Sequence, residues 1–107
     1  MMTALRLRCC VPFCNRTRGQ RKGEEPIREG EEWICHDHWR AVPRKMKAFK
    51  RRAKAKWKRA VGRRDALTGM DDPNYEPVMA EIFMAKARIR WIWARCKRAA
   101  IERGMGL

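Results

Sequence analysis

The stretch that decides the fold is Ile34-Cys35-His36-Asp37-His38-Trp39. Cys35 and His38 are separated by two residues, so both side chains can reach one metal ion. Upstream, Cys10 and Cys14 form a second pair, which gives the spacing Cys-x3-Cys-x20-Cys-x2-His. Four sulfur and nitrogen donors in two close pairs, joined by a polar loop, are typical of a zinc site. We therefore predict that Zn²⁺ is bound by Cys10, Cys14, Cys35 and His38.

The choice of ligand is open at two positions. Cys9 and Cys10 are adjacent, and only one of them can easily face the same ion as Cys14. We favour Cys10 and interpret Cys9 as a small buried apolar residue. His36 is the alternative imidazole, but it points elsewhere if the turn after Cys35 is helical. Because four protein ligands leave no open coordination position, the predicted role of the metal is structural rather than catalytic.

Composition sets the broad class of protein. The chain of 107 residues has 27 Lys and Arg against 12 Asp and Glu, a formal net charge of +15. This excess indicates a polyanionic partner, most simply nucleic acid. No apolar run approaches the ~20 residues that span a bilayer, and Met1–Arg8 lacks the apolar core of a signal peptide. Five cysteines, an odd number, favour thiolates held by metal in a reducing cytoplasm over a disulfide framework.

The N-terminal region has the pattern of short strands around a loop. Over residues 5–9, Leu and Cys alternate with Arg, which predicts a strand. Residues 15–32 are polar and contain Gly and Pro, so we expect a loop there. Trp33 and Cys35 resume the alternation and predict a second short strand. A helical turn over residues 36–41 should follow.

Two long helices are predicted after this region. The first begins near Pro43, because proline is well tolerated in the first turn of a helix, and extends to Arg64. The second extends from about Tyr75 to Arg103, with acidic residues near its start and basic residues near its end, as the helix dipole favours. Its apolar stripe is Val78, Ile82, Ala85, Ile89, Ile92 or Trp93, Cys96 and Ala99.

We expect the two long helices to form an antiparallel hairpin. Counting outward from the intervening loop places Trp57 opposite Phe83 and Phe49 near Trp91, and these contacts should form the main core. The predicted fold class is therefore mainly α. A zinc knuckle with a short β-hairpin occupies residues 1–42, and an antiparallel two-helix hairpin occupies residues 43–107, as one compact unit.

The helix over residues 44–64 carries the strongest indication of function. Between His38 and Arg64 there are 13 Lys or Arg and no acid. Such a helix repels itself unless its apolar stripe packs and an anionic partner binds its other faces. Asn and Gln, which read base edges, are scarce, so we expect contacts with DNA or RNA phosphates without sequence specificity. The predicted contacts are Arg44, Lys47, Lys50, Arg51, Lys54, Lys58 and Arg59.

Two resemblances support these expectations. A Cys-x2-His pair at the start of a helix, after a strand and a knuckle, resembles a treble-clef zinc finger. Residues 33–60 also carry the motif Cys35-x2-His38-Trp39-x3-Pro43-Arg44-x-Met46, continuing to Trp57. This motif is similar to one in small zinc-finger proteins of bacteriophages and their bacterial hosts. The resemblance implies an upstream cysteine knuckle and a bacterial cytoplasmic location, but no firm activity.

Other function classes fit the sequence less well. His36-Asp37-His38 is faintly similar to ββα-metal (HNH) nucleases, but the following helix offers only Lys and Arg where those enzymes need a further metal ligand. The chain has no serine, which excludes serine nucleophiles, so we predict that it is not an enzyme. A THAP-type finger is rejected because its ligand pairs lie much farther apart. The alternative is a phage or prophage regulator that docks a host machine such as RNA polymerase or the ribosome. With either function, the chain is expected to be a monomer or a homodimer.

Overall fold

The computed structural model describes residues 5–106, so residues 1–4 and 107 of the two predicted regions lie outside the described residues. The chain divides into two compact units. The knuckle unit comprises residues 1–43 and 97–107, and the hairpin unit comprises residues 44–96. The predicted fold class is confirmed: the molecule is mainly helical, with a short β-hairpin followed by helices. The last residues of the region predicted as a helical hairpin belong to the knuckle unit.

The β-hairpin of the knuckle unit pairs β1 (Leu7–Arg8) with β2 (Thr17–Arg18) in antiparallel fashion. β2 lies where the sequence predicted a loop. The predicted second strand at Trp33 is wrong, because that residue makes only an isolated parallel bridge with Cys9. The backbone N–H of Cys9 donates to the Arg16 carbonyl at 3.0 Å, while that of Cys10 donates to the Trp33 carbonyl at 2.9 Å. The segment after β1 is therefore paired on both sides.

Helix α1 (His36–Arg40) starts directly after Cys35, whose backbone is extended at φ −66° and ψ 161°. It is the short helical turn that the sequence predicted. Pro43 explains why α1 ends shortly before it, because proline lacks an N–H and disfavours helical geometry in the preceding residue. The core of the knuckle unit is small, and its buried apolar residues are Leu7, Cys9, Val11, Ile34, Cys35, Val42 and Ala100.

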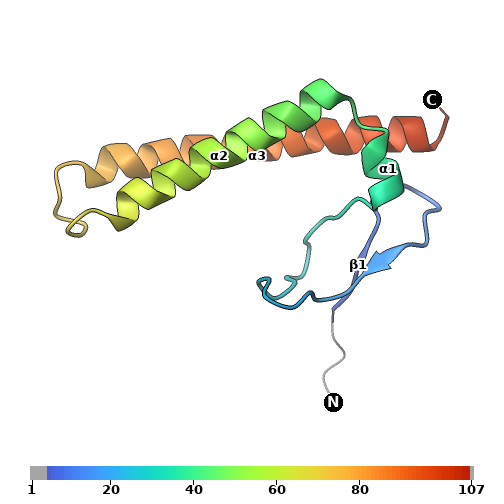
Figure 1. Ribbon diagram of the computed structural model, residues 1–107, viewed down its shortest axis with the longest axis horizontal. Coiled ribbons are helices and arrows are strands. Elements are labelled where there is room, and N and C mark those ends of the chain that lie inside the picture. The colour runs from blue at the N-terminus through green and yellow to red at the C-terminus, as the bar shows by residue number, and fades with distance from the viewer. Residues whose placement is uncertain (1–4, 107) are drawn as a thin grey trace, which may run out of the picture. The chain divides into compact units, whose positions relative to one another are not determined.

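The hairpin unit is formed by α2 (Arg44–Asp65) and the part of α3 (Tyr75–Gly104) up to Cys96. Figure 1 shows α2 lying alongside α3, joined by a short loop at one end. Both helices match the predicted bounds within one residue. In the loop, Asp72 accepts the N–H of Asn74 at 2.9 Å and the hydroxyl of Thr68 at 3.3 Å. These bonds shape the chain just before α3.

The hairpin core consists mainly of small and β-branched side chains. Its buried residues are Ala53, Ala60, Val78, Ile82, Ala85, Ile92 and Cys96, and Trp57 packs against the cluster of Ala60, Val78 and Ile82. The predicted stripe of α3 therefore faces α2.

The predicted aromatic core is wrong. Phe49 is 52% exposed, Phe83 63% and Trp91 61%. The reason is helical geometry: Trp91 follows Ile82 by nine residues, which places it about 180° around the helix at 3.6 residues per turn. Once Ile82 faces α2, Trp91 must face away from it.

Candidate metal centre and basic helix face

Four side chains of the knuckle unit converge on one point. Cys9, Cys14, Cys35 and His38 each offer one donor atom, and these atoms lie within 4.8 Å of one another. Cys9 follows β1, Cys14 ends the turn between the strands, and the other two residues flank the start of α1. The group could hold a metal ion.

The distances between donor atoms fit a tetrahedral ion. The Sγ atoms of Cys14 and Cys35 are 3.9 Å apart. Nδ1 of His38 lies 3.5 Å from Sγ of Cys9 and 3.2 Å from Sγ of Cys35. Zinc bonds of about 2.3 Å to sulfur and about 2.0 Å to nitrogen give tetrahedral edges of roughly 3.8 Å and 3.5 Å. Both the donor set and its size therefore fit Zn²⁺.

The prediction of Cys10 as a ligand is corrected to Cys9. The alternation of the strand explains the difference, since Leu7 and Cys9 point to the buried side and Cys10 to the other. Sγ of Cys10 lies 3.8 Å from a carboxylate oxygen of Glu32, which also forms an ion pair with Lys97. Burial, reinforced by the charge of Glu32, raises the pKa of the Cys10 thiol. Burial raises the pKa of the Cys9 thiol as well, so position and not acidity distinguishes the two cysteines: Cys9 belongs to the converging group and Cys10 does not.

The start of α1 brings Cys35 and His38 together. Cys35 occupies the N-cap position and His38 the third helical position, and side chains at these two positions meet at a helix start. The carbonyl of Cys35 accepts the N–H of Trp39 at 2.9 Å, which fixes the first turn. His36, the alternative imidazole, is exposed and is not a member of the donor group.

Backbone N–H groups stabilise negative charge on the sulfurs. The N–H of Cys35 donates to Sγ of Cys9 at 3.3 Å. Burial opposes ionisation of the Cys35 thiol, but the backbone N–H groups of His38 and Asp37 and the neighbouring thiols outweigh it, so the pKa of Cys35 is lowered. Such hydrogen bonds orient metal ligands and favour the thiolate form that binds zinc.

A charged pair flanks the donor group. Arg16 and Asp37 form an ion pair at 2.5 Å, and both side chains are about half exposed. Asp37 is the main cause of the raised pKa of Arg16, and the thiols of Cys35 and Cys14 add to it. Three thiolates, a neutral imidazole and a divalent ion would carry one net negative charge, so the guanidinium of Arg16 is well placed to balance it.

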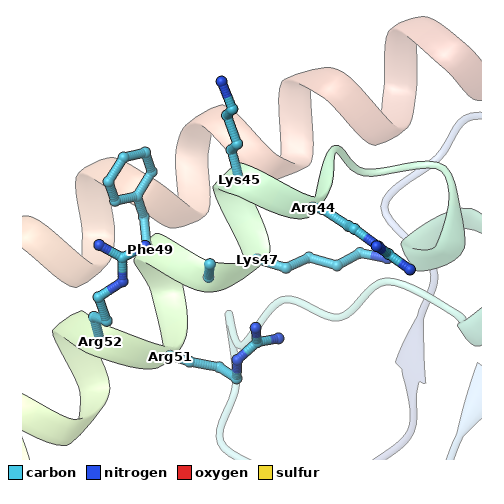
Figure 2. Close-up of a pocket in the computed structure, with 7 residues that line it drawn as sticks. Arg44, Lys45, Lys47, Phe49, Arg51 and Arg52 are labelled. Atoms are coloured by element: carbon cyan, nitrogen blue, oxygen red, sulfur yellow. The ribbon is translucent and has the colours of Figure 1, made fainter.

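The second feature is the outer face of α2, in the hairpin unit. The helix contains 12 Lys and Arg and one acid, Asp65. A groove at its N-terminal end is lined by Arg44, Lys45, Lys47, Ala48, Phe49, Arg51 and Arg52. Figure 2 shows that the basic side chains spread from this part of the helix, with Arg44 and Lys47 extending in the same direction.

The predicted phosphate contacts are not equally accessible. Arg44, Arg51, Lys54, Lys58 and Arg59 are exposed, and Lys47 is partly buried. Lys50 differs, because its ammonium lies 5.6 Å from the centre of the Trp93 ring and burial lowers its pKa. Lys45 and Arg52 are also exposed in the groove, although they are not among the predicted contacts. The sequence could have indicated both residues, because they directly follow the predicted contacts Arg44 and Arg51.

Comparison with family models, with curated proteins and with solved structures gives no match for this chain. Among the described residues, no helix combines the length and the apolar character that crossing a membrane requires. The metal centre and the basic helix are therefore the features from which a function can be inferred.

Proposed function

We propose that the chain is a non-catalytic zinc protein that binds DNA or RNA phosphates through the outer face of α2. The observation that supports this most strongly is a repeat of adjacent cations at residues 44–45, 51–52 and 58–59, all exposed. Each pair follows the previous one by seven residues, or about 10.5 Å along the helix. The three pairs therefore span roughly 21 Å on one side of the helix.

Small residues separate these pairs on the same face. Ala48, Ala55 and Gly62 also recur every seven residues, and each lies three residues after a pair of cations. Short side chains allow the helix backbone to approach a polyanion closely while long Arg and Lys side chains reach to either side. Double-stranded DNA carries one negative charge per ~1.7 Å of its axis, so this face can meet many phosphates at once.

The role of zinc in this proposal is structural. Bound by Cys9, Cys14, Cys35 and His38, it would cross-link the β-hairpin to α1 in a unit with a small apolar core. A closed set of four protein ligands offers no coordination position to a substrate, which supports a non-catalytic protein. A reducing cytoplasm would keep the thiolates available for metal.

Nucleic-acid binding is tested by fluorescence anisotropy with DNA and RNA oligonucleotides over a range of salt concentrations. We expect affinity to fall steeply with salt, and Arg51→Gln/Arg52→Gln to reduce the logarithmic slope by about 1.8, or about 0.9 per lost phosphate contact. The matched control is Arg21→Gln/Lys22→Gln, which removes the same charge from an adjacent exposed pair in the loop before residue 32.

The proposal fails if affinity is independent of salt, or if the control variant weakens binding as much as the α2 variant. Nuclease treatment during purification separates the alternative class of partner. A complex with a cellular protein that survives nuclease would favour a protein target over nucleic acid.

A further inference from the structure

Three large apolar side chains of α3 lie on the outside of the hairpin unit. Phe83, Met84 and Trp91 of α3 are 63%, 74% and 61% exposed. The side chains buried between the helices are mostly smaller, with three alanines among them. Exposing Trp, Phe and Met while burying Ala is unfavourable for an isolated hairpin, because burial of apolar area is the main source of stability. This arrangement indicates a surface that another molecule covers.

The exposed residues of α3 have the spacing of a helix-pairing surface. Met84 and Trp91 are seven residues apart, and Ala80, Ala87 and Ala94 repeat at the same interval. All five are exposed, and each alanine lies three or four residues from Met84 or Trp91. We call these five residues the α3 seam. Apolar residues that alternate at three and four positions are the pattern by which two helices pack as a coiled coil.

We propose that the α3 seam binds the α3 seam of a second copy of this chain, in antiparallel orientation. Antiparallel pairing brings Ala87 of one copy against Trp91 of the other, and Met84 against Ala94. Each layer then combines one small and one large side chain, so the two surfaces are complementary. Parallel pairing would place Trp91 against Trp91 and leave the layers of alanine poorly filled.

Charge complementarity favours the same orientation. In the antiparallel register, Glu81 of one copy lies beside Arg95 of the other, and twofold symmetry produces this pair twice. Both residues are exposed and lie on the flank of the seam, where Glu81 also pairs with Arg63 of its own chain and Arg95 lies over the Trp91 ring. A parallel dimer would instead place Arg90 of one copy beside Arg95 of the other along both edges, where like charges repel.

The size of the seam indicates a weak, reversible dimer. Applying the exposed fractions of Met84 and Trp91 to side chains of roughly 200 Å² gives an apolar area of about 270 Å² per copy, to which the three exposed alanines add. This is as large as the main apolar patch on many monomers, but below the roughly 800 Å² per partner of stable complexes. We therefore expect dissociation in the micromolar range, which the net charge of +15 per chain would weaken further at low salt.

The dimer and nucleic-acid binding respond to salt in opposite directions, which separates the two proposals. Salt screens the repulsion between two positive chains and should strengthen the dimer, whereas it weakens phosphate contacts. The experiment is sedimentation equilibrium of the zinc-loaded full-length protein, freed of nucleic acid, at about 0.15 and about 0.5 M NaCl. We expect a monomer–dimer equilibrium that shifts to dimer at the higher salt.

Two exposed methionines provide a matched pair of variants. Met84→Lys changes the seam, and Met70→Lys makes the same change at a residue that is 77% exposed in the loop before α3. Met84→Lys should raise the dimer dissociation constant tenfold or more, while Met70→Lys should leave it within about twofold. Circular dichroism should show the same helix content for both, because neither side chain is buried.

The antiparallel register is tested by exchanging charges. Glu81→Arg and Arg95→Glu should each weaken the dimer, and the double exchange should restore it at least in part. A wild-type protein that stays monomeric at several hundred micromolar, or equal effects of Met84→Lys and Met70→Lys, would overturn the proposal. Failure of the double exchange to restore the dimer would refute the antiparallel register. Salt-dependent binding of an oligonucleotide by a strictly monomeric protein would leave the function of α2 supported.

Discussion

Gly104 of α3 lies against the imidazole ring of His38. A Cβ atom at position 104 would stand 3.3 Å from Cδ2 of His38 and 2.7 Å from Cγ1 of Val11. The end of α3 thus packs on the histidine of the metal centre at a distance that only glycine permits. Lys97 of the same helix forms an ion pair with Glu32, so α3 contacts the knuckle at two points.

This packing predicts that Gly104→Ala destabilises the protein, although alanine is the better helix former. The gain in helix propensity is about 1 kcal/mol, whereas overpacking costs roughly 1–3 kcal/mol, so a net loss and faster zinc release are expected. Thermal unfolding and transfer of zinc to a chelator measure both. Gly62→Ala in α2 is the control, because nothing lies within 4 Å of a Cβ there, and it should stabilise the protein. Stabilisation by both substitutions would contradict the packing.

The assignment of the fourth ligand predicts different effects for two neighbouring cysteines. Cys9→Ser should lower zinc affinity by more than about a hundredfold, because it removes a ligand. Cys10→Ser should retain one zinc per chain, since that thiol faces Glu32 instead. Metal analysis and the absorption spectrum of the Co²⁺-substituted protein distinguish three sulfur ligands from two. Loss of zinc in Cys10→Ser with retention in Cys9→Ser would restore the original assignment.

The choice between Cys9 and Cys10 shows where reasoning from sequence succeeded and where it failed. The spacing in the sequence was enough to predict Cys14, Cys35 and His38 as ligands. The two-residue gap and the helix start involve only neighbouring residues, so the sequence shows both directly. The spacing did not distinguish adjacent cysteines, although the alternation that places Leu7 and Cys9 on one side already favoured Cys9. The strand Thr17–Arg18 was missed because polar residues in a two-residue strand have no distinctive pattern.

The helical hairpin shows a different limit. Its bounds followed from the sequence, because Pro43 and the loop around Gly69 interrupt the helical pattern on either side. The predicted aromatic core did not follow in the same way. Counting outward from the loop pairs residues by position along the helices, but it does not say which face of each helix is buried. The stripe containing Ile82 excludes Trp91 by rotation alone. The sequence predicted that stripe correctly, so the exposure of Trp91 could have been predicted from the sequence as well.

The loop before α3 predicts a local dependence on pH. The Asp72 carboxylate accepts hydrogen bonds from the backbone N–H of Asn74 and from the N–H and hydroxyl of Thr68. These bonds lower the pKa of Asp72, and the bond from Asn74 has the largest effect. Because the pKa of Asp72 is lower in the folded state, the ionised carboxylate stabilises the loop fully at pH values above its unfolded-state pKa of about 4. This stabilisation is lost as the pH falls through the folded-state pKa. Hydrogen exchange of the Val78 amide, bonded to the Asn74 carbonyl at 3.1 Å, reports on this turn.

We expect protection of that amide in the wild-type protein to decline below about pH 4, and Asp72→Asn to remove most of this decline. The local measurement avoids the separate effect of acid on zinc binding. Asp71→Asn, which changes the adjacent exposed residue, is the control and should retain the wild-type profile. Identical profiles for wild type and Asp72→Asn would show that these hydrogen bonds do not stabilise the carboxylate.

Two adjacent residues of α3 separate the hairpin core from the α3 surface. Ile82 is 4% exposed and packs with Ala60 and Val78, whereas Phe83 is 63% exposed. Ile82→Ala should lower the free energy of unfolding by about 2–4 kcal/mol, because it leaves a cavity between the helices. Phe83→Ala removes a larger side chain but should cost less than about 1 kcal/mol in the dilute monomer. Urea unfolding at low protein concentration tests both, and a greater cost for Phe83→Ala would mean that the helix is rotated relative to the arrangement described.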